Sequence, residues 1–84
     1  MNKKQLKERS KLLRPVIRVG KNGITPELIN EIKQIIIKKH LIKIKLLSPV
    51  IKDKNKKEIA AELIEKTGTT LIDQVGFVVV LYKE

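Results

Sequence analysis

Apolar residues recur along the chain with helical spacing in some stretches and with strand spacing in others. The clearest helical pattern lies in residues 26–39, where apolar side chains repeat every three to four positions and share one face. These side chains are Leu28, Ile29, Ile32, Ile35 and Ile36. Weaker helical patterns predict further helices over 2–14 and 54–67. Apolar and β-branched runs predict strands over 15–19, 41–47, 69–72 and 77–82.

Turn and capping residues separate these predicted elements. Pro15 cannot continue the first helix, so we expect that helix to end just before it. Residues 48–53 form a connection, and its last residue, Asp53, is the expected N-cap of the third helix. Gly68 is the expected terminator of that helix. Residues 73–76 then join the last two strands into an antiparallel hairpin.

The order of elements predicts a small α/β domain. A helix lies between the strands at 15–19 and 41–47, which favours a right-handed parallel β-α-β unit. With the terminal hairpin, the order becomes α-β-α-β-α-β-β, a single domain over residues 1–84 built on a four-stranded mixed sheet.

Basic residues occupy one side of two predicted elements. In the strand at 41–47, Lys43 and Lys45 alternate with apolar residues, which predicts a half-buried strand with a basic outer side. In the first helix, basic residues fall three or four positions apart and would share one face. They are Lys3, Lys7, Lys11 and Arg14. Like charges at this spacing repel, so we interpret this face as directed toward phosphates.

Net charge and amino-acid composition limit the classes of function that the chain can have. Nineteen Lys and Arg against nine Asp and Glu give the 84-residue chain a formal charge of +10, which favours a polyanionic partner. There is no cysteine and only one histidine, so a disulfide scaffold and a zinc site are not expected. No set of residues resembles an assembled active site. We therefore expect a cytoplasmic monomer that is not an enzyme and needs neither metal nor cofactor.

A glycine-bounded loop is the strongest candidate site. Gly20-Lys21-Asn22-Gly23 follows the first predicted strand and precedes the helix start Thr25-Pro26-Glu27. A strand, a tight loop and a helix N-terminus together direct unpaired N–H groups at one point, where an anion binds. The residues that a phosphate-binding NTPase loop needs after its last glycine are missing. A GxxG loop is also the device by which KH domains hold a nucleic-acid backbone.

Aromatic residues are scarce. Phe77 and Tyr82 are the only ones, whereas domains that read single-stranded bases by stacking need aromatic platforms. We expect recognition of phosphates and shape, with an affinity that falls steeply with salt.

Taken in order and spacing, several stretches resemble the chloroplast RNA splicing and ribosome maturation (CRM) domain, in its single-domain YhbY-like form. They are residues 13–25, 41–45, 58–60, 67–68, 75–76 and 80–83. The resemblance implies an RNA-binding domain with a fold similar to the C-terminal domain of translation initiation factor three. It also implies binding to ribosomal RNA or precursors of the large ribosomal subunit, with RNA contacts at Gly20, Lys21, Asn22 and Gly23. His40 departs from the glutamate that relatives often carry there, and the lack of an added domain or basic tail argues against a splicing factor.

The candidate RNA-binding residues therefore extend beyond the loop to Arg18, Arg14, Lys11, Lys7, Lys43 and Lys45. Lys43 and Lys45 contribute only if their strand presents them on the same side as the loop. Two other functions stay open. One is architectural DNA or RNA binding of the Alba type, which suits the size and charge equally well. The other is a protein-interaction subunit that exposes residues 75–82 as an edge strand.

Overall fold

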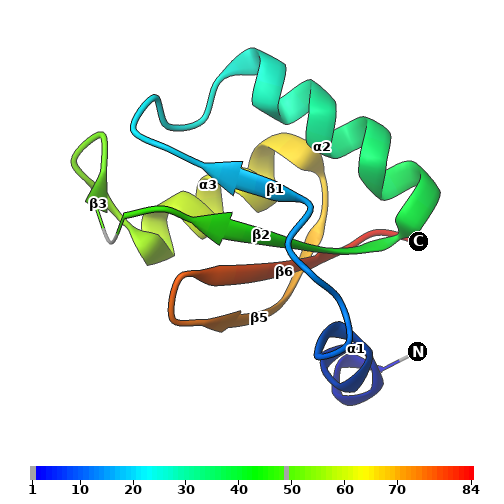
Figure 1. The fold of residues 1–84 in the computed structure, drawn as a ribbon. Coiled ribbons are helices and arrows are strands. Elements are labelled where there is room, and N and C mark those ends of the chain that lie inside the picture. Colours follow the sequence, from blue (N-terminus) through cyan, green and yellow to red (C-terminus); the bar gives the residue numbers. More distant parts are fainter. Residues whose placement is uncertain (1, 49) are drawn as a thin grey trace.

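The computed structural model describes residues 2–48 and 50–84 and contains a four-stranded sheet with helices on both faces (Figure 1). The strands lie in the order β1-β2-β6-β5, with β1 and β2 parallel and the other pairs antiparallel. The elements in chain order are α1 (Lys3–Ser10), β1 (Ile17–Val19), α2 (Pro26–Lys39), β2 (Leu41–Leu46), β3 (Val50–Ile51), β4 (Lys54–Asn55), α3 (Lys56–Thr67), β5 (Thr70–Val75) and β6 (Val78–Tyr82). The predicted mixed four-stranded sheet and its parallel β-α-β unit are confirmed.

Helices α2 and α3 cover one face of the sheet. Their buried side chains, Ile32 and Ile36 from α2 and Ile59 and Leu63 from α3, join the inward-facing residues of β1, β2 and β6 in one apolar cluster. In β2 the alternation predicted from sequence holds, with Ile42, Ile44 and Leu46 in this cluster. This cluster is the main core, and it anchors β1, β2 and β6.

Helix α1 packs on the opposite face of the sheet. Leu6 of α1 meets Leu41, Ile72 and Val80 in a second, smaller cluster. The helix is only eight residues long and contacts mainly β2 and β5. It therefore leaves part of this face open, and we call that part the open sheet face.

The first helix ends earlier than predicted. It stops at Ser10, and tighter i→i−3 bonds link Lys11, Leu12 and Leu13 back to the preceding turn. The predicted end at Arg14 was wrong: Leu12, which a further turn of helix would carry, is 87% exposed and adds little packing. Tertiary packing, rather than the proline, decides where this helix ends.

A two-stranded hairpin replaces the predicted connection before the third helix. Strands β3 and β4 pair antiparallel, and the residues between them, Lys52 and Asp53, both have positive φ, as in the turns that suit short hairpins. Asp53 is therefore a turn residue and not the N-cap. The N-cap is Asn55, which exchanges side-chain and backbone bonds with Glu58 in a capping box.

The terminal hairpin is longer than predicted in its first strand. Strand β5 continues to Val75, and the turn lies at Gly76 and Phe77 rather than over 73–76. Polar Asp73 and Gln74 lie within this strand, and the register shifts between Leu71 and Asp73. Because β6 lies between β2 and β5, with Val79, Val80 and Leu81 buried, residues 75–82 are not an exposed edge strand. This finding counts against the protein-interaction function considered above.

Candidate nucleic-acid interface

The Gly20–Gly23 loop forms a tight turn between β1 and α2. The N–H of Gly23 donates to the carbonyl of Gly20 at 3.0 Å, which closes the turn. Gly23 is buried and has φ +71, a conformation that favours glycine. The second glycine of the predicted motif is thus required by the backbone itself.

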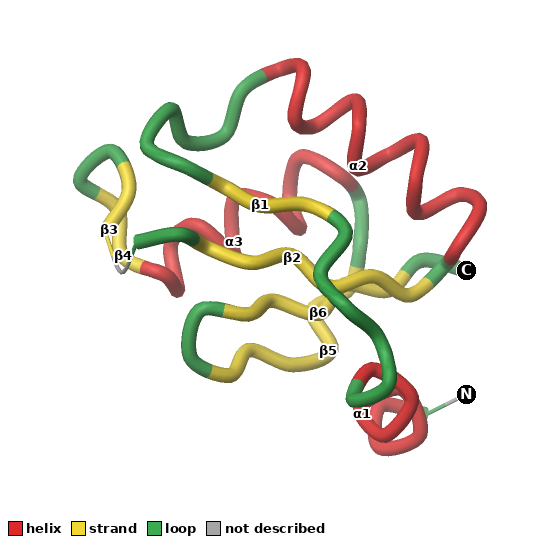
Figure 2. Tube along the Cα trace, in the orientation of Figure 1, coloured by secondary structure: helices red, strands yellow, loops and turns green. Residues whose placement is uncertain are grey.

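The β3–β4 hairpin supports this loop from behind. A Cβ placed on Gly23 would lie 3.0 Å from Cγ of Lys52 and 3.6 Å from Cγ2 of Ile51. In Figure 2 the green loop after β1 and the β3–β4 hairpin lie at the same end of the molecule. Sequence reasoning missed Lys52 as a neighbour of the loop, because strands of two residues carry no periodic signal.

Gly20 is less constrained by the protein itself. A Cβ on Gly20 would have Cδ1 of Leu47 at 3.8 Å as its nearest neighbour, which is ordinary van der Waals contact. Gly20 also lacks a positive φ. The fold therefore accommodates a small side chain at Gly20 but not at Gly23.

The tip of the loop has hydrogen-bond donors available for a ligand. Lys21 and Asn22 are exposed, and within residues 2–48 and 50–84 their backbone N–H groups have no acceptor. In the same described part of the chain, the Lys21 ammonium has no carboxylate partner. The loop thus offers two main-chain donors and one cation to an anion.

The backbone N–H groups at the start of α2 are only partly available to a ligand. Thr25 caps the helix, because its Oγ1 accepts from the N–H of Leu28 at 3.1 Å, and Pro26 has no N–H to offer. Glu27 and Glu31 line the same hollow of about 440 Å³ as the loop and Arg18. These carboxylates disfavour an anion deep in the helix start, so the loop tip is the better position for a phosphate.

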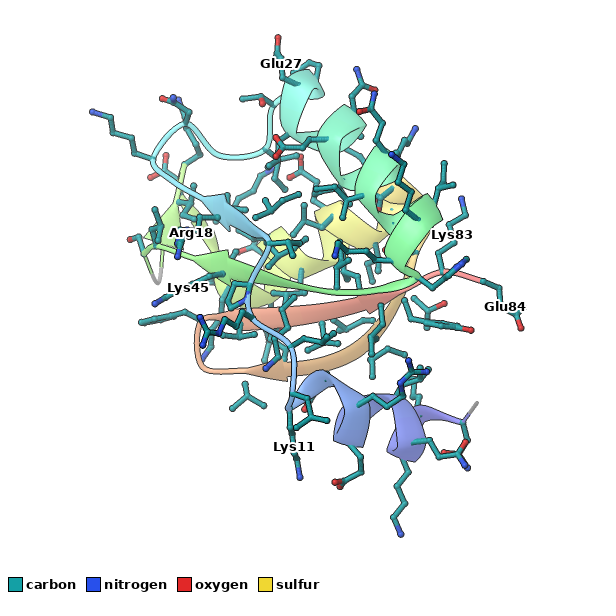
Figure 3. All side chains as sticks on the ribbon, turned by 45° about the vertical axis from the view of Figure 1, so that its right-hand side comes forward. Lys11, Arg18, Glu27, Lys45, Lys83 and Glu84 are labelled. Atoms are coloured by element: carbon teal, nitrogen blue, oxygen red, sulfur yellow. The ribbon has the colours of Figure 1, made fainter. Side chains whose placement is uncertain are left out.

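Arg18 and Lys45 lie on the open sheet face. The β1–β2 register pairs Arg18 with Lys45, and both are exposed (Figure 3). Lys43 shares this face two residues earlier in β2 and is half-buried. None of the three forms an ion pair in the described residues. Strand β2 therefore presents Lys43 and Lys45 on the same face of the sheet as Arg18, which itself lines a hollow with the loop.

The basic residues of the N-terminal segment do not form one helical face. Lys7 lies on α1, but Lys11 and Arg14 follow the end of the helix, so the predicted single face was wrong. Lys11 pairs with Glu8 at 3.3 Å and lines a hollow together with Lys43. Arg14 lies exposed in the connection to β1.

Several other charged side chains contact partners within the protein instead of contributing to this basic surface. Glu62 of α3 accepts from the ammonium groups of Lys54 and Lys66, the latter at 2.8 Å. The hydrogen bond from Lys54, followed by that from Lys66, holds the pKa of Glu62 below its usual value. The Lys56 ammonium lies 5.9 Å from the ring centre of Phe77. Lys54, Lys56 and Lys66 thus have partners within the fold.

Comparison with known proteins identifies the family. The family model for the CRS1 / YhbY (CRM) domain matches residues 1–83. The chain belongs to this family. A Bacillus subtilis (strain 168) relative named "Probable RNA-binding protein YqeI" is 32% identical over 82 residues, covering 98% of this chain and 83% of the relative.

A solved structure of a relative has the same fold. The solution structure of the hypothetical protein SAV1595 from Staphylococcus aureus, described as a candidate RNA-binding protein, matches with a TM-score of 0.81. It is 32% identical, and the match covers 98% of this chain and 83% of that one. The predicted family and fold class are both confirmed.

The described residues contain no arrangement suited to a bound metal. Within residues 2–48 and 50–84, no group of three or more His, Asp or Glu side chains comes together. No helix in that part of the chain is long and apolar enough to cross a membrane.

Proposed function

We propose that this CRM-domain protein is a non-enzymatic RNA-binding protein that binds ribosomal RNA in precursors of the large subunit. It acts in the cytoplasm as a monomer, without a cofactor. The observation that carries the proposal is the loop tip: within residues 2–48 and 50–84 the N–H groups of Lys21 and Asn22 have no acceptor and the Lys21 ammonium has no carboxylate partner, in a chain of charge +10. Family membership and the names of the relatives support RNA as the polyanion.

The loop and the open sheet face would act together. Lys21 and the loop amides hold one phosphate, and Gly20 permits the backbone of the RNA to approach closely. Arg18 and Lys45, paired in register on neighbouring strands, hold the next phosphates along the sheet. Lys43 and Lys11, which line one hollow beside α1, add charge on this face, and we assign Lys7 and Arg14 to the same RNA-binding surface.

A titration tests both the partner and the site. The protein is titrated at equal salt with a structured RNA and with a duplex DNA of matched length. We expect tighter binding to the RNA; equal or tighter binding to the DNA would favour an architectural DNA-binding function instead. Lys21→Ala and Gly23→Asp should both weaken RNA binding, and unchanged binding in both variants would remove the loop from the account.

The ribosomal partner needs a test in cells. Crosslinking in the source organism, followed by sequencing of the attached nucleic acid, should recover mainly large-subunit precursor RNA. Recovery of messenger RNA would preserve RNA binding but contradict the ribosomal role. Recovery of genomic DNA would overturn the proposal as a whole.

A further inference from the structure

A second hollow lies on the open sheet face, next to the C-terminal end of α1. Its volume is about 330 Å³, within the range of small-molecule sites. It is lined by Ser10, Lys11, Lys43, Asp73, Val75, Val78 and Val80. Neither charge nor periodicity along the sequence brings these residues together, because they come from the end of α1, the residue after it, and strands β2, β5 and β6.

The register of three strands places the main lining residues of the hollow in a row across the sheet. Asp73, Val80 and Lys43 lie opposite one another on β5, β6 and β2, so the carboxylate and the ammonium stand on either side of a valine. Two strand spacings separate the Cα atoms of Asp73 and Lys43, about 9.5 Å. Val75 and Val78 form the next register pair on the same face of the sheet. The hollow therefore has an apolar floor with an acid at one side and a cation at the other.

Asp73 keeps acceptor capacity for a ligand. Its Oδ1 accepts from the N–H of Gln74 at 2.9 Å, and among residues 2–48 and 50–84 it forms no ion pair. Lys43 likewise has no carboxylate partner there, although Lys11 is paired with Glu8. A carboxylate on this face repels phosphates, so it works against the surrounding lysines unless it accepts from a donor on the ligand.

We propose that this hollow binds one unpaired guanine base of the bound RNA. The proposal rests on RNA binding as argued above and extends it from phosphate contacts to base recognition. Guanine offers two neighbouring donors, N1–H and the N2 amino group, to the Asp73 carboxylate. Its O6 and N7 acceptors suit an ammonium such as that of Lys43. Adenine, cytosine and uracil cannot present two adjacent donors, and the valine floor supports the flat face of a base without an aromatic platform.

The hollow continues the phosphate path from the loop. The register places Arg18 opposite Lys45, Lys45 opposite Val78 and Val78 opposite Val75. An RNA strand held at the loop and crossing Arg18 and Lys45 thus reaches the hollow by following one row of residues. The phosphates give affinity along this row, and the base gives specificity at its end.

Hairpin RNAs that differ at one unpaired nucleotide test the proposal. The variable nucleotide, guanosine, inosine or adenosine, is placed at each loop position in turn, and affinity is measured for wild type, Asp73→Asn and the control Asp53→Asn. Inosine keeps N1–H but lacks the N2 amino group. At one loop position, wild type and Asp53→Asn should bind the guanosine RNA about tenfold more tightly than the inosine RNA, as expected for loss of part of a bidentate pair.

The possible outcomes distinguish the proposed guanine site from the proposed RNA-binding function. Asp73→Asn should abolish the preference for guanosine. RNA binding that depends on Lys21 but is equal for the three nucleotides at every position would overturn the base site while leaving the proposed function in place. An Asp73→Asn variant that binds all RNAs more tightly and to the same extent as Asp53→Asn would also overturn it, because Asp73 would then act only as a negative charge. A wild type that binds none of the RNAs would overturn both proposals.

Discussion

Gly23 of the loop lies directly against the side chain of Lys52 in the β3–β4 hairpin: a Cβ on the glycine would come within 3.0 Å of Lys52 Cγ. The candidate phosphate loop is therefore shaped by a hairpin that follows β2, about thirty residues later in the chain. Any change that moves this hairpin should change the loop. The relationship is tested by substitutions at the glycines of the chain.

Gly23→Ala should destabilise the protein by about 2–3 kcal/mol for two reasons. Alanine is strained at the positive φ of this position, and its Cβ would conflict with the side chain of Lys52. Gly76→Ala is the matched control, since Gly76 has φ +57 but no atom within 4 Å of the added Cβ. We expect about 1 kcal/mol there. Gly20→Ala, with neither problem, should change stability by less than about 0.5 kcal/mol. Urea unfolding measures all three.

The steric contribution to the cost of Gly23→Ala can be measured separately in a protein that already carries a substitution at Lys52. Lys52→Ala removes the Cγ atom that conflicts with a Cβ at Gly23, so Gly23→Ala should be less costly in that background than in wild type. A double-mutant cycle measures this difference. Equal costs in the two backgrounds would show that the contact between hairpin and loop is unimportant.

Asn55→Ala should destabilise the protein by about 1 kcal/mol, because it removes the capping box at the start of α3. Asp53→Asn should be close to neutral, since Asn accepts the left-handed conformation of that turn residue. Thermal unfolding of the two variants checks where the helix begins. An Asn55→Ala variant as stable as wild type would contradict Asn55 as the N-cap of α3.

Glu62 should make stability depend on pH in the acid range. Its pKa is lowered in the folded protein from a usual value of 4.5 by the ammonium groups of Lys54 and Lys66. The ionised form is thus favoured by folding, so this contribution is complete above about pH 4.5 and is lost as pH falls through the lower folded pKa. Because the lysines are about half exposed, the contribution should be below about 1 kcal/mol.

Glu62→Gln is the test of this contribution. At pH 7 the variant should be slightly less stable than wild type, and the difference should shrink as pH falls below about 4.5. Urea unfolding at several pH values measures both curves. A difference that grows as pH falls would contradict the assigned direction.

Lys21→Ala should reduce the salt dependence of RNA binding. Each phosphate contact contributes nearly one unit to the slope of log affinity against log salt, so loss of one contact should lower the slope by about one. Lys38→Ala is the control, because Lys38 lies at the other end of α2, about 18 Å along the helix axis from Pro26. A similar loss of slope in both variants would indicate diffuse attraction by net charge rather than a phosphate site.

Much of this fold follows from local patterns in the sequence. The 3.6-residue period of α2 and the alternation in β2 both place their buried faces correctly, because long amphipathic elements must match the core. The loop at Gly20–Gly23 is also predictable from its neighbours, because glycines between a strand and a helix cap are typical of a tight turn. These features are encoded by residues close in sequence.

The remaining features depend on contacts that are distant in sequence or on competition between neighbouring residues. Asp53 and Asn55 are both good caps, and Glu58 decides between them because it completes a capping box only with Asn55. The β3–β4 hairpin is too short to have a period. The hollow around Asp73 depends on the register of three strands, which no local pattern specifies.

The most direct test of the central claim is an NMR titration of the protein with a structured RNA, following the backbone amide signals. We predict the largest shifts at Lys21 and Asn22, with further shifts at Arg18 and Lys45, and none around Lys38. Shifts confined to the outer surfaces of α2 and α3, with the amides of Lys21 and Asn22 unchanged, would contradict the account.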